Sequence, residues 1–571
     1  MGCGGLTRGA ANRQLLPGVL TLMHPRSRRR LAPAVAVVLS ACAHGAPAGL
    51  APLTVPDSGM AFPAADSASV THLLNRFAFG ARPGDIARVQ AVGIRGWLEE
   101  QLNPGRIRDT AGTAALRPFA RALENPTELY AAYAPPPTAR QDSAARRRAM
   151  EGARDLGGQV MMTALARHIA SDRQLLEVMT DFWTNHFNIF MEKGADRWLT
   201  ADFVERAIRP HALGKFEDLL VATAVHPAML VYLDNAQSVA PGARPPAARA
   251  PATFGRRGFA PMFAPPLRSA TPRAESGINE NYARELLELH TLGVDGGYTQ
   301  QDVIEVARVF TGWGIAQPKR MGIGHYGFEF HAWAHDYGPK EVLGVAFPAG
   351  HGEDEGRRLL HLLAENPATA RHLSYELCQR FVADAPPDGC VDAAVAAWQR
   401  TDGDIRAVLV AIAGSPDFWA PENDRAKFKA PLAFVASAVR VLDAEPDSTA
   451  RLANTLRRLG EPPFRHLTPD GYPDAAADWL NSGAILTRMN IALALASDRL
   501  PGVAVDLDRL CPVTGDYDQL VSRVNAVVLG GQGSDHTLQA IRQQIADLPN
   551  ARNARTMAVA LALGSPDFQR E

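Results

Sequence analysis

The sequence has little of several features that often point to function. Its 571 residues include only five cysteines, so a disulfide-rich scaffold is excluded. Acidic and basic residues almost balance, with 60 Asp and Glu against 59 Lys and Arg and a formal net charge of −1. Proteins dedicated to nucleic acids carry a basic footprint. The charge balance therefore argues against a nucleic-acid partner.

Short catalytic motifs are also missing. No CxxC, HExxH, GxSxG, P-loop or Rossmann fingerprint occurs at a convincing position, so no common reaction is indicated by a motif alone. Beyond the N-terminal region, no apolar run approaches the 18 or so residues that a membrane-spanning helix needs. Any site must be inferred from helix patterns and side-chain chemistry.

The fold class follows from length and periodicity. A chain of 571 residues predicts two or three domains, and 46% hydrophobic residues suffice for large cores. Patterns with a period of 3.6 residues outnumber alternating ones. We expect a mainly α protein of packed multi-helical bundles. Gly, Pro and short β-prone runs predict one small β-hairpin near residues 325–346.

The N-terminus has the pattern of an export signal. Residues 1–42 contain a basic segment, a short apolar run and Leu39-Ser40-Ala41-Cys42, which resembles a bacterial lipobox. We expect Cys42 to be lipidated and the protein to be exported, anchored to a membrane and facing the periplasm or the cell exterior. The alternative is ordinary cleavage with Cys42 incidental, and both the general and the twin-arginine export routes remain open. Residues 43–66 are small and Pro-rich, which suits a flexible tether.

The remaining chain divides by composition. We expect an N-terminal helical part at 67–238, a central motif region at 276–350 and a C-terminal helical part at 351–571. Between the first two, residues 239–275 form a Pro- and Arg-rich insertion. This insertion is either a disordered surface loop or a lid whose arginines meet an anionic ligand. Cys378 and Cys390 are twelve residues apart, and a disulfide between them suits an exported chain.

The central motif region contains the densest group of polar side chains. Asn279 is a good N-cap for a helix whose apolar face includes Tyr282, Leu286 and Leu287. A Gly-rich turn follows, and Thr299 with Asp302 predicts a capping box at the start of a second helix. Both helices should be amphipathic.

Two interpretations of the polar face of this helix remain open. Glu280, Arg284, Glu285 and Glu288 form either a solvated face with helix salt bridges or the lining of a cleft. In a cleft, clustered carboxylates would have displaced pKa values suited to acid/base catalysis. Glu285 and Glu288 are the leading candidates, with Arg284 and Glu280 beside them.

Other candidate side chains come from different segments. His186 lies on the apolar face of a helix predicted over about 172–190, where it is either a satisfied core residue or a site residue beside Asn185. His335 and Asp336 are candidate ligands for a divalent metal, and the competing interpretation is a structural turn. No other cofactor is indicated.

Several long segments resemble the bacterial family catalogued as domain of unknown function 1800. They are NENYARELLELHTLGVDGGYTQQDV in the central region, HLLNRFAFGARPGD from His72, FWTNHFNIF from Phe182 and HDYGPK from His335. The resemblance covers nearly everything from about residue 68 to the end. It implies an exported, mainly helical protein of undetermined activity. It also implies a partner, because members are often encoded beside a second exported, sulfatase-like protein.

Two functional hypotheses follow. The first is an envelope hydrolase or lyase that uses a carboxylate and histidine cluster, assisted by a metal in one version, on an envelope or extracellular polymer. The second is a non-catalytic envelope scaffold or binding partner, in which the polar residues form a buried network that fixes the fold. A closed-off pocket containing Glu285 and Glu288, with His186 or His335 within hydrogen-bond reach, would favour the first hypothesis. Glu285 and Glu288 facing bulk solvent, in a protein without metal, would count against it.

Overall fold

The computed structural model describes residues 51–55, 62–135, 142–244, 277–316 and 326–571, and its helices follow the apolar periodicity of the sequence. It is 61% helical, which confirms the mainly α fold class. Residues Gly49–Glu571 form a single unit. The predicted signal at 1–42, including Cys42, most of the tether and most of the 239–275 insertion lie outside the described residues.

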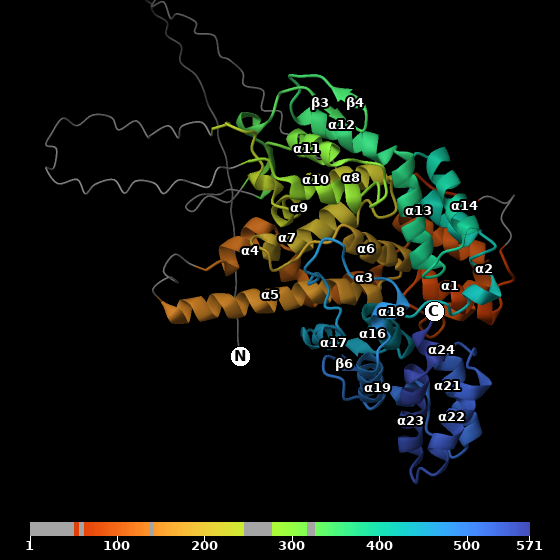
Figure 1. The fold of residues 1–571 in the computed structure, drawn as a ribbon. Coiled ribbons are helices and arrows are strands. Elements are labelled where there is room, and N and C mark those ends of the chain that lie inside the picture. The colour runs from red at the N-terminus through yellow and green to blue at the C-terminus, as the bar shows by residue number, and fades with distance from the viewer. Residues whose placement is uncertain (1–50, 56–61, 136–141, 245–276, 317–325) are drawn as a thin grey trace, which may run out of the picture. The chain divides into compact units, whose positions relative to one another are not determined.

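The first helices occupy the predicted N-terminal part and the central motif region (Figure 1). Their bounds are α1 (Ser67–Phe77), α2 (Asp85–Leu102), α3 (Thr110–Leu116), α4 (Pro126–Tyr133), α5 (Ser143–Ala170), α6 (Gln174–His186), α7 (Asp196–Asp202), α8 (Phe216–Ala224), α9 (Pro227–Tyr232), α10 (Glu280–Glu288) and α11 (Gln300–Val309). A π-helical turn, η4 (Phe203–Ile208), continues directly from α7.

The later helices complete the C-terminal part. Their bounds are α12 (Glu353–Ala364), α13 (Pro367–Phe381), α14 (Asp388–Arg400), α15 (Ile405–Ala413), α16 (Pro431–Val441), α17 (Arg451–Leu459), α18 (Ala476–Trp479), α19 (Ser482–Ala496), α20 (Leu507–Leu510), α21 (Tyr517–Val528), α22 (Asp535–Ala546), α23 (Ala551–Gly564) and α24 (Pro566–Gln569). Short 3-10 turns connect several of them.

The β-structure consists of three two-stranded antiparallel pairs. They are β1 (Trp313–Ala316) with β2 (Gly327–Phe330), β3 (Lys340–Val342) with β4 (Val345–Phe347), and β5 (Glu445–Pro446) with β6 (Val503–Ala504). The predicted hairpin region near 325–346 therefore contains parts of two pairs. The first strand in that region, β2, pairs with the earlier strand β1, and the tight hairpin is formed by β3 and β4.

The predicted helix caps are present in the structure. The Asn279 side chain accepts a hydrogen bond from the Asn281 backbone N–H at 2.8 Å, and α10 begins at the next residue, Glu280. Thr299 and Asp302 form a capping box at the start of α11. These local signals act within one turn of chain, so they can be recognised without knowledge of tertiary packing.

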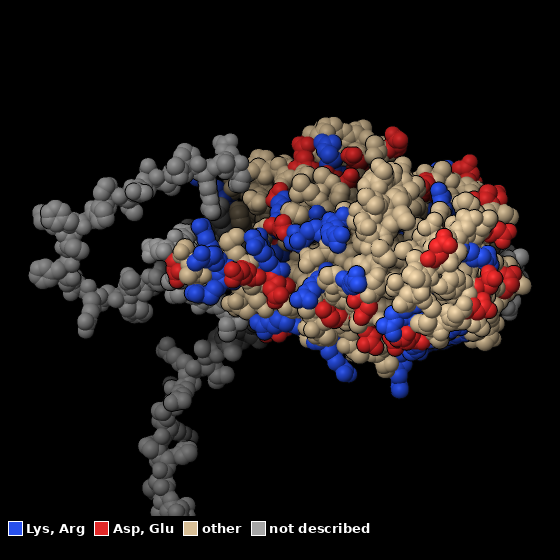
Figure 2. Space-filling model, turned by 90° about the horizontal axis from the view of Figure 1, so that it is seen from below, with Lys and Arg blue, Asp and Glu red and all other residues tan. Residues whose placement is uncertain are grey.

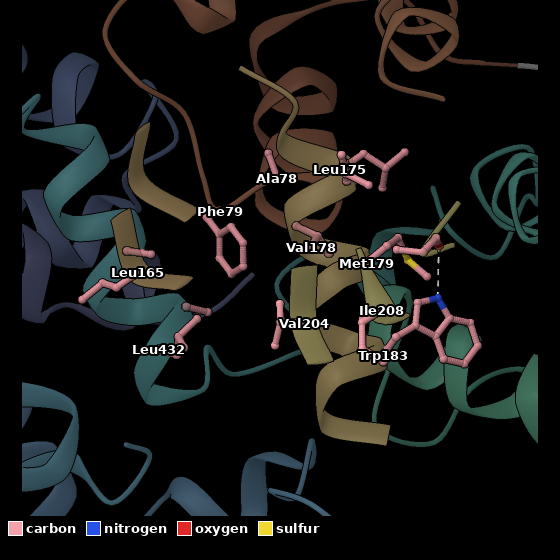
Figure 3. Close-up of a cluster of buried hydrophobic side chains, with 14 of the residues drawn as sticks. Ala78, Phe79, Leu165, Leu175, Val178, Met179, Trp183, Val204, Ile208 and Leu432 are labelled. Carbon is pink, nitrogen blue, oxygen red and sulfur yellow. Dashed lines mark hydrogen bonds between the residues drawn. The ribbon is translucent and has the colours of Figure 1, made fainter. Parts of the chain in front are cut away.

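Helix α6 lies in the hydrophobic core, and its position determines where the candidate site forms. Leu175, Val178, Met179 and Trp183 are fully buried along one side of it (Figure 3). The Trp183 indole N–H donates to the Ala212 backbone carbonyl at 3.1 Å, the bond drawn as a dashed line. This packing holds α6 rigidly, so its other side presents a fixed row of polar residues.

The predicted N-terminal and C-terminal parts pack against each other. Helix α5 contacts α16 and α17, and α1 contacts α13. These contacts bring segments more than 200 residues apart side by side around α6 (Figure 1). Interior polar walls can therefore be built from both parts of the chain.

The surface carries charged side chains of both signs, as the balanced composition predicts. On the face shown in Figure 2, Lys and Arg side chains are interspersed with Asp and Glu side chains. Among the described residues, no helix is long and apolar enough to cross a membrane.

Candidate functional site

Polar residues of α6 line a cavity of about 310 Å³. Glu177, Asp181, Thr184 and Asn185 recur at helical spacing and all contribute to its wall. The opposite side of α6 is the apolar face described above. The helix thus separates a hydrophobic core from a chamber lined by both polar and apolar side chains.

The second wall comes from the loop at 461–474, which is bonded to Asn185 of α6 and to Asn188, two residues beyond the end of that helix. Asn185 donates to the Tyr472 carbonyl at 2.8 Å and accepts from the Tyr472 backbone N–H at 2.7 Å. Asn188 donates to the carbonyls of His466 at 3.2 Å and Thr468 at 2.7 Å. Asn185, predicted as a site residue, therefore lines the cavity and positions its facing loop.

Two carboxyl groups in the cavity have raised pKa values. Burial raises the pKa of Asp181 to about 6, and the charge of Arg380 opposes this. Burial raises the pKa of Glu461 to about 8, and the negative charge of Asp181 adds to the effect. Oε2 of Glu461 accepts a hydrogen bond from the Leu432 backbone N–H at 2.6 Å, which fixes the side chain. The two acids therefore favour different protonation states near neutral pH.

His186 supplies a third ionisable group to the same cavity. Its side chain is 4% exposed, and its Nδ1 lies 2.9 Å from Oε2 of Glu376 on α13. His372 contacts the other oxygen of Glu376 at 3.4 Å. Burial opposes ionisation of Glu376, but the charges of the two histidines and a hydrogen bond from His186 outweigh it and lower its pKa. Glu376 therefore remains a carboxylate and holds the His186 ring in place.

His290, two residues after the end of α10, lies beside this pair. The His186 and His290 rings are 6.0 Å apart between centroids. Burial, followed by the charge of His186, lowers the pKa of His290 well below its usual value. This imidazole is neutral, and its Nε2 is buried without a partner among the described residues.

Several lining groups have incomplete hydrogen bonding. Glu177 is ion-paired to Arg209, yet its Oε2 is buried without a partner in the described part of the chain. The same holds for Nδ1 of His168 and Oγ1 of Thr184. Buried polar atoms are nearly always satisfied by protein, water or a ligand. Water or a polar ligand in the cavity would satisfy these atoms.

The carboxylates of the central helix lie elsewhere. None of Glu280, Arg284, Glu285 and Glu288 lines the cavity. Arg284 and Glu280 form a half-exposed pair at 3.6 Å, and Glu288 accepts from the Tyr298 hydroxyl at 3.1 Å. These contacts match the solvated-face interpretation.

Of these four residues, Glu285 has two properties of a site residue, partial burial and a raised pKa. It is half-buried, and burial, then the charge of Glu288, raises its pKa. The charge of Asp470, which does line the cavity, acts in the same direction. The structure thus brings His186 and Asn185 together in the cavity and leaves Glu285 outside it.

His335 and Asp336 are held by structural contacts. Nδ1 of His335 lies 2.8 Å from the Thr311 carbonyl, and its Nε2 lies 3.2 Å from the His351 carbonyl. Asp336 accepts from Nε of Arg308 at 2.8 Å and from the Gly338 backbone N–H at 2.9 Å. Within the described ranges, no group of three or more His, Cys, Asp or Glu side chains could hold a metal ion. The geometry favours the structural turn.

Cys378 and Cys390 face each other in the core. Both are buried free cysteines, and their Sγ atoms lie 2.6 Å apart. The hydrogen bond between them, together with burial, raises the pKa of the Cys378 thiol. The two sulfur atoms are therefore close enough for oxidation to join them.

Sequence reasoning missed Asp181, Glu461 and Glu376. Charged residues on a helix are mostly exposed, so Glu177 and Asp181 look like an ordinary solvated stripe. The available signal was their recurrence with Thr184 and Asn185 on a helix whose other side is strongly apolar. Glu461 lies in a Pro-rich loop and carries no local signal.

Comparison with known proteins gives one match. The model of the family described as "Protein of unknown function (DUF1800)" matches residues 72–570. Searches of the curated proteins and of the solved structures gave no match. The match includes α6, α13 and the loop at 461–474, the three elements that supply Asp181, Glu376 and Glu461. The chain therefore belongs to the DUF1800 family.

Proposed function

We propose that the cavity is the active site of a hydrolase or lyase that works by general acid/base catalysis. The observation that carries the proposal is the convergence of Asp181, Glu461 and the His186–Glu376 pair on one polar cavity. Ionisable groups with displaced pKa values cluster at functional sites.

The two raised carboxyl groups suit complementary tasks. Near pH 7, a carboxyl group with a pKa of about 6 is mostly ionised, and one with a pKa of about 8 is mostly protonated. Environments that separate two pKa values in this way assign a base and an acid. Asp181 would accept a proton from water or from a substrate carbon. Glu461 would protonate the leaving oxygen.

Glu376 would orient the His186 imidazole at the same cavity through its contact with Nδ1. An imidazole oriented by a carboxylate can take up or release a proton during a reaction.

The place of action is part of the proposal. The lipobox-like sequence ending at Cys42 supports an exported, lipid-anchored protein that acts on an envelope or extracellular polymer. Incorporation of labelled palmitate would test the anchor. Label should appear in the full chain, disappear in Cys42→Ser and persist in the control Cys511→Ser.

A non-catalytic scaffold is the second candidate, and the Asn185 and Asn188 contacts favour it. These side chains form hydrogen bonds to the backbone of the 461–474 loop, as expected of a network that fixes the fold. In that case, substitutions in the cavity would change stability and partner binding but no reaction rate.

The deciding experiment measures turnover by the purified full chain on a panel of envelope polysaccharides and chromogenic glycosides and esters. Asp181→Asn and Glu461→Gln should each lower kcat by roughly 100-fold or more. Glu280→Gln, outside the cavity, should leave kcat unchanged. The pH–rate profile should be bell-shaped, with limbs near 6 and 8. Turnover that survives both cavity substitutions, or a panel without turnover, would contradict the proposal.

A further inference from the structure

A second cavity, of about 440 Å³, lies between α1, α2, α16 and α21. Its charged lining consists of four cations, Arg82, Arg425, Lys429 and Arg523, and a single carboxylate, Asp567. This excess of positive charge contrasts with the balanced composition of the whole chain. The charge of the lining favours an anionic occupant.

Two of the four cations are already neutralised. Arg425 pairs with Asp567 at 3.0 Å, and Arg82 lies 3.8 Å from Asp172. Asp567 also accepts hydrogen bonds from the backbone N–H and the hydroxyl of Ser534, both at 2.8 Å. The one lining carboxylate is therefore fully engaged and does not compensate the remaining cations.

Lys429 is the decisive residue. It is 3% exposed, and among the described residues no carboxylate lies within 4.0 Å of its ammonium group. The ammonium group instead lies over the Phe568 ring, 4.2 Å from its centroid. A buried charge without a partner is strongly unfavourable, so such groups are normally paired or neutral. Lys429 therefore has no direct ion-pair partner among the described residues.

The charges around Lys429 are mainly positive. Burial lowers its pKa to about 8; Glu571 opposes this, while Arg488, Arg425 and Arg76 lower it further. Arg488 donates to the Lys429 carbonyl at 2.8 Å, and its Nε and Nη1 are buried without partners in the described chain. An anion beside Lys429 would face a strongly positive potential.

Neutral donors complete the cavity wall. Asn75 and Gln90 line it, and neither side chain has a hydrogen-bond partner within the described residues. Arg523 is exposed at the mouth, where its Nε donates to the Leu510 carbonyl at 2.9 Å and its terminal nitrogens remain available. Arginine and amide groups at such positions suit the oxygens of a tetrahedral anion.

We propose that this second cavity binds a phosphate group, free or as the ester of a small alcohol, with Lys429 as its buried counter-ion and Arg523 at its mouth. The site is separate from the acid/base cavity and does not depend on the function proposed there. Binding would convert an unpaired buried ammonium group into a buried ion pair.

The test uses the full chain and measures binding of inorganic phosphate and of glycerol 3-phosphate by calorimetry and thermal denaturation, at constant ionic strength set with chloride. Phosphate should bind and raise Tm. Lys429→Met should weaken binding at least 10-fold, and Arg523→Gln should weaken it several-fold. The matched controls, Lys215→Met and Arg371→Gln, lie outside the cavity and should bind like the wild type. Tighter binding of glycerol 3-phosphate would identify an ester as the ligand, and equal or weaker binding would identify the free ion.

A pH series provides a readout that does not depend on the folding of any variant. Inorganic sulfate serves as the probe here because its charge is constant across the range. Affinity should fall between pH 7 and pH 9.5 as Lys429 loses its proton, and binding at pH 8.5 should be accompanied by proton uptake. Equal affinity in the wild type and in Lys429→Met, or affinity independent of pH, would overturn the proposal.

Discussion

Glu461→Gln should remove the pH dependence of stability that the wild-type carboxyl group imposes. The folded pKa of Glu461 is raised from 4.5 to about 8 because burial and Asp181 disfavour its charged form. At about 1.36 kcal/mol per tenfold change in proton affinity, the full effect is on the order of 5 kcal/mol. The residue keeps partial exposure, so about 2 to 5 kcal/mol is expected.

The sign of this effect follows from proton binding. Below pH 4.5, both folded and unfolded chains are protonated at residue 461, so the group contributes no difference. Between pH 4.5 and 8, the unfolded chain loses the proton and the folded chain keeps it, so stability falls as pH rises. Above pH 8, the penalty is complete. Glutamine does not titrate, and its carbonyl oxygen can still accept the Leu432 N–H.

The assay is urea denaturation of the wild type and of Glu461→Gln at pH 5, 7 and 9. The variant should gain on the wild type by about 2 to 5 kcal/mol between pH 5 and 9. Glu365→Gln, at a side chain that is 60% exposed, is the control and should show little change. A difference that is flat with pH, or that grows in favour of the wild type, would refute the reasoning.

Two further predictions concern contacts that maintain the fold. In the absence of reductant, we expect a disulfide between Cys378 and Cys390, and Cys378→Ser should lower the free energy of unfolding by about 2 to 4 kcal/mol, as expected for a short closed loop. Dithiothreitol should remove this difference between the variant and the wild type. Peptide mapping that finds both thiols free would contradict the predicted disulfide. Asn185→Ala should cost about 1 to 3 kcal/mol because two hydrogen bonds to Tyr472 are lost. Limited proteolysis should then cut the 461–474 loop faster than in the exposed control Asn454→Ala, and an unchanged rate would count against the clamp.

The fold class and the helix caps could be predicted because their causes are local. Asn279 and the Thr299–Asp302 box stabilise the first turn of their own helices, and the apolar period of α6 is visible within thirteen residues. The structure shows all three. Two hairpin strands also lie in the predicted region, although β2 pairs with an earlier strand that the sequence did not indicate.

The site could be predicted only in part, because its walls come from distant segments. His186 and Asn185 belong to a helix with a clear pattern, so both were identifiable candidates. Glu376 and Glu461 approach them only after the chain has folded back across more than 180 residues. The carboxylates of the central helix were attractive because they cluster in sequence. Clustering within one helix face is equally typical of solvated salt bridges, and that is where Glu280 and Arg284 are found.

The attachment of the 461–474 loop to α6 has a consequence for dissecting this protein. The bond between Asn185 and Tyr472 joins residues 287 positions apart, so no short excerpt of the polypeptide contains both sides of the chamber. Deletion libraries and isolated fragments should retain helices yet lose the chamber altogether. An activity of this cavity would therefore require the whole region from α6 to the 461–474 loop, both in natural variants and in engineered ones.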